Sequence, residues 1–299
     1  MLFSILKNKD FIKRVTVIFL LWLLNTPTAL FSFTKSIDYG QYGYYLDFLT
    51  FRAGDTEKTL VEIFGQFPAQ NFKFVKSVEG YCAHYELSIR LLNQDDELIQ
   101  WTHQIDSVKV SSTNTISNLS QRLTRALFVV PPGQYRAELY LIDLKTHATL
   151  TFIMNIVAPD YGYSGLKVSD LQISTLINST EEKSALVKNN WKIWPNIPRL
   201  FGMNSPTLYV YAELYNFSHR LGEHKQGFVA TYTITNNRRQ EVTSLDLSKE
   251  IPGETFVLVA KIPIQELKSG QYRLTLNVKG VASGKVIEKS TYFNIVNPI

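Results

Sequence analysis

The sequence predicts an all-β protein with two tandem immunoglobulin-like antiparallel β-sandwich domains after an N-terminal signal peptide. Three observations indicate this fold: apolar residues alternate with a period of two, aromatic residues make up 13% of the chain, and a long stretch of sequence occurs twice. Apolar residues form 45% of the 299 residues and charged residues 19%, so the chain has enough apolar side chains for two cores.

The N-terminus has the pattern of a secretory signal peptide. Basic residues dominate the first 14 positions, an apolar run follows at 15–24, and small residues come at Ala29 and Ser32. The run is shorter than the roughly 20 residues that a membrane-spanning helix needs. We therefore expect a signal peptide at 1–32 and an extracytoplasmic protein, periplasmic or secreted. An uncleaved N-terminal anchor is the alternative, and it is the one way in which we expect the protein to contact a membrane.

Period-two alternation is clearest at residues 80–91. Tyr85 and Leu87 belong to the apolar face of this expected strand, and the other face is polar. One buried and one solvated face are typical of an antiparallel sheet. Residues 93–96 predict a hairpin turn, and the return strand is expected at 97–104.

Later segments continue the strand pattern. Strands are expected at 134–144 and 148–157, after a break at the Pro-Pro-Gly sequence of 131–133. A short helix is expected at 118–127. Short strands at this spacing favour a sandwich or a barrel.

An internal repeat indicates a duplicated domain. Gly-Gln-Tyr-Arg at 133–136 recurs at 270–273, and Asn-Ile-Val at 155–157 recurs at 294–296. The copies stand 137 to 139 residues apart, which is a domain length and not the length of a solenoid unit.

The expected boundary between the copies lies in the turn-rich linker 159–165. Domain 1 is then expected at 36–158 and domain 2 at 166–299.

Each copy has a tyrosine just after a glycine, at the start of its next-to-last expected strand. These residues, Tyr135 and Tyr272, suit the tyrosine corner of immunoglobulin-like sandwiches, in which the hydroxyl bonds back to the backbone a few residues upstream. A plain core tyrosine is the alternative, and both interpretations give Tyr135 and Tyr272 a structural role.

Six segments resemble the N-terminal β-sandwich modules of secreted bacterial proteins that are named for a GWxTD domain. The segments are 46–51, 59–64, 81–91, 166–171, 195–202 and 208–216. No Gly-Trp pair occurs in the chain, so the GWxTD motif itself is absent. The resemblance implies export and a sandwich architecture, and it implies no chemistry.

The sequence contains no recognisable catalytic or metal-binding pattern. His219, Glu223 and His224 fall in an expected Gly-containing hairpin loop, whereas a zinc motif of two His and a Glu needs one helix face. Asp95, Asp96 and Glu97 form an acidic cluster that lacks the spacing of a calcium loop, so a polar turn is expected there. We expect no metal and no cofactor.

The single cysteine excludes a disulfide framework. By alternation Cys82 lies on the solvated face of its strand, with His84 two residues further on the same face. A covering loop or the other domain is the alternative to an exposed thiol. A net charge of +5 is too small to indicate nucleic-acid binding.

Aromatic residues gather near the middle of the second copy. One face of the strand expected at 208–217 suits the core, and its other face carries Tyr209, Tyr211, Tyr215 and Phe217. The preceding segment adds Trp191 and Trp194. Either this segment or domain 1 covers the tyrosine face, or the rings form an open platform for a partner.

Together these patterns predict a non-catalytic exported scaffold or protein-binding module, with another envelope or secreted protein as its partner. A carbohydrate-binding or accessory module of an extracytoplasmic polysaccharide-processing system is the alternative. A third possibility is a hydrolase whose residues come together only in the fold.

The signal-peptide pattern gives a direct prediction. The purified secreted protein should begin near Phe33, because cleavage is expected after Ser32 or Ala29. Mass spectrometry or N-terminal sequencing measures this, and an intact Met1 would show that the segment is retained.

Overall fold

The computed structural model describes most of the chain beyond the expected signal peptide. The described residues are 37–39, 43–54, 56–119, 121–163, 165–202, 205–216, 226–251, 254–281 and 284–297. The segment 1–32, Phe217, and the expected hairpin loop with His219, Glu223 and His224 lie outside them. As predicted, the fold is all-β: strands dominate the described residues, with two short 3-10 helices, η3 (Ala69–Asn71) and η4 (Thr113–Asn118).

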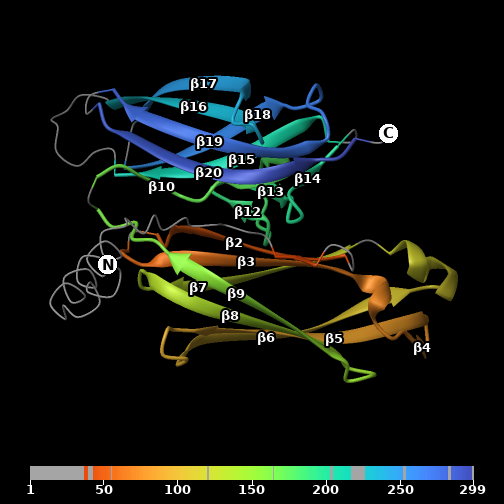
Figure 1. Ribbon diagram of the computed structural model, residues 1–299. Helices are drawn as coiled ribbons and strands as arrows, with labels where there is room; N and C mark the ends of the chain where they lie inside the picture. The colour runs from red at the N-terminus through yellow and green to blue at the C-terminus, as the bar shows by residue number, and fades with distance from the viewer. Residues whose placement is uncertain are drawn as a thin grey trace, which may run out of the picture. The chain divides into compact units, whose positions relative to one another are not determined.

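The first half of the chain forms sandwich 1 from two sheets. Sheet A has the strand order β1 (Ile37–Tyr39), β2 (Tyr44–Arg52), β3 (Thr59–Pro68) and β7 (Gln121–Val130). Sheet B contains β4 (Val75–Ser77), β5 (Gly80–Leu92), β6 (Leu98–Val110), β8 (Gly133–Asp143) and β9 (Thr149–Ala158). Figure 1 shows β6, β5, β8 and β9 in this sheet, and β6 pairs with β5 along nearly its whole length.

The second half forms sandwich 2 in the same way. Sheet C contains β10 (Lys167–Val168), β11 (Gln172–Ser179), β12 (Val187–Lys188), β13 (Trp191–Pro195), β15 (Thr207–Tyr215) and β18 (Thr255–Pro263). Sheet D contains β14 (Leu200–Phe201), β16 (Gln226–Asn236), β17 (Glu241–Ile251), β19 (Gly270–Gly280) and β20 (Val286–Ile295). The pairing of β14 with β20 is parallel, and the other described pairings are antiparallel.

The period-two pattern places one face of each central strand in a core. Tyr85, Leu87 and Ile89 of β5 point into the core between sheets A and B. Tyr232 and Ile234 of β16 occupy the matching place between sheets C and D. Each sandwich therefore has its own apolar core, while residues Thr34–Ile299 form one compact unit.

The sequence repeat corresponds to a repeat in topology. In sheet B, β8 lies between β5 and β9, and in sheet D, β19 lies between β16 and β20. The Gly-Gln-Tyr-Arg sequences begin β8 and β19. The duplicated sequence thus forms the same three-strand arrangement twice.

Two expectations for the first half differ from the structure. The helix expected at 118–127 is wrong: η4 ends at Asn118, and β7 begins at Gln121. Ala126 and Phe128 alternate into the core there, and β3 supplies hydrogen-bonding partners along the whole of β7. The return strand expected at 97–104 extends to Val110, because β5 is long enough to pair with it as far as Tyr81.

Both tyrosines at the strand starts bond back to the upstream backbone. The hydroxyl of Tyr135 donates to the carbonyl of Pro131 at 2.8 Å, and that of Tyr272 donates to Lys268 at 2.9 Å. Both rings are buried. This is the geometry of a tyrosine corner, and each bond ties the start of a core strand to the preceding turn.

Removing the hydroxyl of Tyr272 should measure this bond. We expect Tyr272→Phe to lower the free energy of unfolding by about 1 kcal/mol or more, because the carbonyl of Lys268 loses its partner in a part-buried site. Chemical denaturation gives the value. Tyr140→Phe is the control, since its hydroxyl donates to Glu138 on the outside of sheet B, and equal losses in both variants would contradict a special role for the corner.

Candidate functional site

The aromatic face of β15 lies against sheet A. Tyr211 joins Ile177 and Ile193 of sheet C in one apolar cluster with Leu49, Phe51 and Phe64 of sheet A. Tyr211 is 0% exposed and Tyr215 is 1% exposed. The open platform proposed for these two tyrosines is therefore wrong, because the outer face of sheet A is itself apolar and the two faces bury each other.

The remaining predicted aromatic residues lie at the rim of this interface. Trp191 and Tyr209 are half-buried and pack against the same cluster. Trp194 is half-buried, with the ammonium of Lys192 5.2 Å from its ring centroid. Ile193, between the two tryptophans, points into the cluster. The segment 191–195 thus helps to seal the interface, as one of the two interpretations of the sequence expected, and only its edges reach solvent.

A buried ion pair joins the two sandwiches. Arg199 donates to both carboxylate oxygens of Asp47, from Nε at 2.9 Å and from Nη2 at 2.7 and 2.8 Å. Both side chains are buried. Burial raises the pKa of Asp47 in spite of the adjacent guanidinium. The buried negative charge of Asp47 therefore depends on the guanidinium of Arg199 for its stabilisation.

Asp170 makes a second bridge. Its Oδ2 accepts hydrogen bonds from the backbone N–H and from the hydroxyl of Thr50, both at 2.7 Å, and its Oδ1 pairs with Lys289 at 2.5 Å. Tyr161 lies within hydrogen-bond distance of the Thr50 hydroxyl, at 2.8 Å. Burial raises the pKa of Tyr161 well above its usual value. Asn216, at the end of β15 in sandwich 2, donates from Nδ2 to the carbonyl of Gly162 at 2.7 Å, so the linker is bonded to both sandwiches.

Glu213 interrupts the aromatic face of β15 and organises it. Tyr211 donates to its Oε1 at 2.6 Å and Tyr215 donates to its Oε2 at 2.7 Å, while Asn189 donates to Oε1 at 3.0 Å. Burial, together with the Glu213 charge, raises the pKa of both tyrosines. Both hydroxyls therefore stay protonated and act as hydrogen-bond donors. Tyr215 also accepts from the backbone N–H of Arg52 in sheet A, at 3.0 Å.

Glu62 of sheet A holds two cations at the same interface. Its Oε1 lies 2.9 Å from Lys188 Nζ and 2.7 Å from Arg125 Nη2. Burial lowers the pKa of Lys188. The other oxygen of Glu62 has no hydrogen-bond partner, and a cavity of about 10 Å³ beside it is large enough for about one water molecule. The negative charge of Glu62 and the positive charges of Lys188 and Arg125 offset one another between sheets A and C, so we assign these three groups a structural role.

The other residues considered from the sequence lie apart from this interface. Cys82 is 5% exposed, so its thiol is covered and not solvated, which is the alternative that the sequence left open. Its register neighbours Val75 and Lys109 flank it on the same face and help to cover it. Its Sγ lies 3.3 Å from Nε2 of His84. Asp96 lies in an exposed hairpin turn and pairs with Arg136 at 2.6 Å.

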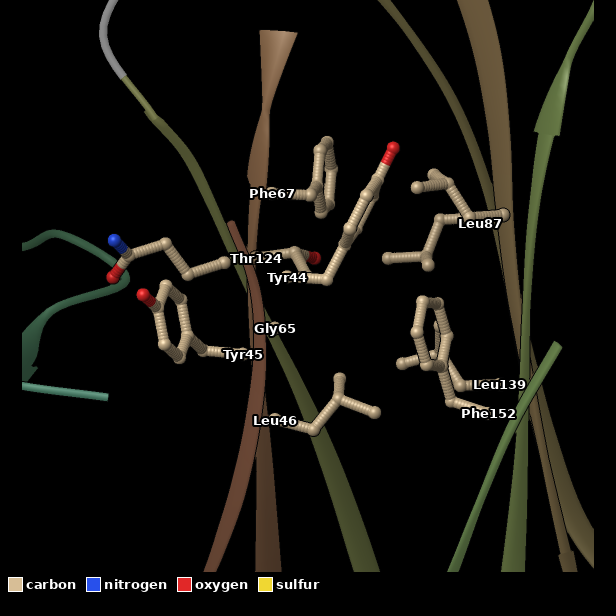
Figure 2. A pocket seen from close by; sticks show the side chains of 11 residues that line it. Tyr44, Tyr45, Leu46, Gly65, Phe67, Leu87, Thr124, Leu139 and Phe152 are labelled. Carbon is tan, nitrogen blue, oxygen red and sulfur yellow. The ribbon is translucent and has the colours of Figure 1, made fainter. Parts of the chain in front are cut away.

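Metal-ligating side chains do not cluster among the described residues. No group of three or more His, Cys, Asp and Glu side chains there could hold a metal ion. Tyr44, Phe67 and Leu87 are among the residues that line a cavity of sandwich 1 (Figure 2). Its volume is about 10 Å³, which leaves room for no more than about one water. A more open hollow of about 300 Å³ in sandwich 2 is lined by Gly, Ser, Pro, Ile, Gln and Asn residues, none of them ionisable.

The most exposed large aromatic side chain among the described residues is one that the sequence analysis missed. Trp101 of β6 is 63% exposed and Ile105 is 57% exposed. Together with Ile99 and His103 they form the outer face of β6, which we call the β6 surface. The signal was present in the sequence, because these residues alternate with polar ones. Trp101, His103 and Ile105 pair in register with the polar face of β5, with Arg90 opposite Trp101, whereas Ile99 lies at a bulge between Leu98 and Gln100.

Ionic side chains border the β6 surface. Arg90 pairs with Glu138 at 3.2 Å, and His103 lies 3.3 Å from Glu86. The indole ring of Trp101 and the imidazole of His103 lie 6.3 Å apart, centroid to centroid. An apolar centre with a polar rim is the usual composition of a protein-binding surface.

Comparisons with known proteins give only distant structural similarity. No protein-family model matches the chain, and no curated protein matches it. The C-terminal domain of Wzt is similar over 46% of this chain and 78% of that chain, at 12% identity and a TM-score of 0.30. A Bacteroides uniformis β-glucuronidase is similar over 84% of this chain, at 15% identity and a TM-score of 0.26, and the match spans 26% of that enzyme. In the described part of the chain, no helix has the length and apolar character to cross a membrane.

The buried ion pair can be tested by breaking it. Arg199→Met should lower the free energy of unfolding by about 3 to 5 kcal/mol, because it leaves Asp47 buried without compensation. Adding Asp47→Leu should recover much of the loss, since no buried charge then remains. Denaturant unfolding measures both variants.

The matched control is Arg273→Met, which breaks the exposed pair with Glu288 and should cost no more than about 1 kcal/mol. A double variant less stable than Arg199→Met would argue against the uncompensated carboxylate as the cause.

Proposed function

We propose that the protein is a non-catalytic exported scaffold whose two sandwiches act together as one protein-binding module. The observation that carries this proposal is the β6 surface: exposed apolar and aromatic side chains on the outer face of sheet B, bordered by ion pairs. Its partner would be another envelope or secreted protein. Export rests on the signal-peptide pattern of residues 1–32.

The interface between the sandwiches supports the scaffold role. Buried ionic and hydrogen-bonded contacts join residues of sheet A to residues more than 100 positions later in the chain, among them Asp47 with Arg199 and Thr50 with Asp170. Such contacts oppose hinge motion between the halves, because opening would expose both apolar faces and separate buried charges. The outer surfaces of the two sandwiches therefore keep a fixed orientation relative to each other, as a scaffold requires.

The composition of the β6 surface supports binding to a protein. Tryptophan is among the residues most often found as the energetic anchor of protein interfaces, where surrounding polar side chains exclude water. Trp101 has Ile99 and Ile105 beside it, and the ion pairs of Arg90 and Glu86 lie next to them. The side chains are held on a sheet, so little ordering is needed when a partner binds.

A carbohydrate-binding role is the second candidate, and one observation favours it. Trp101 stands exposed on a sheet face next to His103, and Tyr140 lies on the same face two strands away. Exposed aromatic rings on a sheet are the contacts that a carbohydrate-binding sandwich would use. A glycan array therefore discriminates between the two candidates.

Truncating Trp101 tests the proposal. Trp101→Ala should weaken the capture of an envelope protein by about 30-fold or more, as loss of an interface anchor does, and should leave the melting temperature nearly unchanged because the ring is exposed. Quantitative pull-down from the native envelope, followed by affinity measurement with the identified partner, gives the result.

Tyr292→Ala is the control, because Tyr292 is also an exposed aromatic residue but lies on sheet D of sandwich 2. Unchanged partner affinity in Trp101→Ala would refute the proposed surface. Binding of defined glycans that Trp101→Ala abolishes would instead support the carbohydrate-binding alternative.

A further inference from the structure

A hollow of about 300 Å³ lies at one end of sandwich 2. Its lining comes from the ends of strands: the residues just after β14 and β18, those just before β15, and those at and beyond the end of β20. Small-molecule pockets in proteins have volumes of about 300 to 1,000 Å³, so this hollow has room for one small ligand.

The floor of the hollow is apolar. Ile264 is 4% exposed and Ile295 is 3% exposed, and both belong to the core of sandwich 2. Pro206 lies beside Ile264, because its carbonyl accepts from the backbone N–H of Ile264 at 2.9 Å. These side chains offer a ligand only apolar contact.

Uncharged polar side chains complete the lining: Ser205, Gln265 and Asn297. In the described structure, the hydroxyl of Ser205 and the amide of Gln265 have no hydrogen-bonding partner. Asn297 donates from Nδ2 to the carbonyl of Leu267 at 3.0 Å, which orients its side chain and leaves Oδ1 available as an acceptor. The hollow therefore offers both donors and acceptors without a charge.

The segments that line the hollow are additions to the duplicated fold. The connection from β18 to β19 comprises residues 264–269, whereas the connection from β7 to β8 comprises only residues 131–132. Strand β14 pairs in parallel with β20, whereas the described pairings of sheet B are all antiparallel. Sandwich 1 shows that the repeated arrangement forms without these segments.

One position of the repeated sequence also differs at this place. Asn-Ile-Val-Ala-Pro at 155–159 corresponds to Asn-Ile-Val-Asn-Pro at 294–298. Ala158 is 2% exposed in the core of sandwich 1, whereas Asn297 is half-buried and lines the hollow. The second copy thus has an amide where the first has a core methyl group. Together with the added segments, this difference indicates a ligand site.

We propose that the hollow binds one uncharged sugar ring. A charged ligand would find no compensating charge, because none of the lining residues is ionisable. A wholly apolar ligand would cover Ser205 and Gln265 and leave their polar groups without partners. A pyranose ring avoids both costs, because its C–H face can lie on Ile264 and Ile295 while its hydroxyl groups donate to and accept from the polar side chains.

This site goes beyond the proposed function and does not depend on it. All of its lining residues belong to sandwich 2, whereas the β6 surface belongs to sandwich 1. A free monosaccharide and the terminal unit of a glycan offer the same ring chemistry. They differ at the anomeric oxygen, which is substituted only in the glycan.

NMR of the purified full-length protein with labelled isoleucine methyl groups tests the proposal. Ile264 and Ile295 report from the hollow, and the exposed Ile105 reports from the β6 surface. The probes are glucose, galactose, mannose and N-acetylglucosamine, each as the free sugar and as its methyl glycoside, with glucuronate as a charged comparison.

We expect at least one uncharged sugar to shift the signals of Ile264 and Ile295 but not that of Ile105, with a Kd in the millimolar range. Glucuronate should bind more weakly than this sugar. Binding of a methyl glycoside identifies the terminal unit of a glycan as the ligand, and binding of free sugars alone identifies a monosaccharide.

Removing the unpartnered polar groups should weaken the binding. The double variant Ser205→Ala with Gln265→Ala should raise the Kd about tenfold, because it removes two hydrogen bonds to the sugar. Neither side chain has a hydrogen bond within the described structure, so we expect the fold to be kept. Gln271→Ala is the matched control, since Gln271 is an exposed glutamine of β19 that does not line the hollow.

Asn297→Ala gives a second measurement, because it introduces the residue that the first copy has at the matching position. It should also raise the Kd, and a melting curve verifies that the variant is folded. The proposal is overturned if none of the uncharged sugars binds well above millimolar concentration, if glucuronate binds more tightly than all of them, or if the double variant keeps the wild-type Kd.

Trp101→Ala separates this inference from the proposed function. If the variant loses the protein partner and still binds the sugar, both proposals stand. If no sugar shifts Ile264 or Ile295 and the partner still depends on Trp101, this inference fails and the proposed function remains. A sugar that shifts only Ile105, and that Trp101→Ala no longer binds, overturns the site in the hollow and supports carbohydrate binding at the β6 surface.

Discussion

The structure depends on the mutual burial of two sheet faces, the outer face of sheet A and the outer face of sheet C. Sheet A is apolar on both sides: Phe48 and Ile63 face the core of sandwich 1, whereas Phe51 and Phe64 face sheet C. A sheet with two apolar faces needs cover on both. Sandwich 1 therefore exposes a large apolar surface unless sandwich 2 covers it, and residues Thr34–Ile299 form one compact unit for this reason.

Buried polar groups determine how these two faces fit together. Apolar contact alone allows many orientations, but Asp47 must meet Arg199, and Tyr215 must meet the backbone of Arg52, for their buried groups to be compensated. Buried ion pairs add little net stability relative to apolar replacements, so their effect is mainly to exclude other arrangements. The same network explains why strongly perturbed tyrosine pKa values occur here without catalytic geometry.

This interface changes which surface is available for binding. The aromatic residues that the sequence made conspicuous, Tyr211 and Tyr215, are used to join the halves of the chain. Trp101 stands instead on the outer face of sheet B, which faces away from the interface because sheet A lies between them. The proposed binding surface follows from this division between a covered and an uncovered side of sandwich 1.

The sequence by itself determined the all-β class, the inward face of strands such as β5, and the repeated start of β8 and β19. These features depend on neighbours close in the chain: alternation has a period of two, and the Tyr135 hydroxyl bonds only four residues upstream. The tertiary structure alone decided the positions of Tyr215, Cys82 and Trp101 relative to solvent. Alternation shows whether a strand face is apolar or polar, but it does not show which residues cover that face. The covering residues lie far away in the sequence: Arg52 and Tyr215, which meet in the fold, are 163 positions apart.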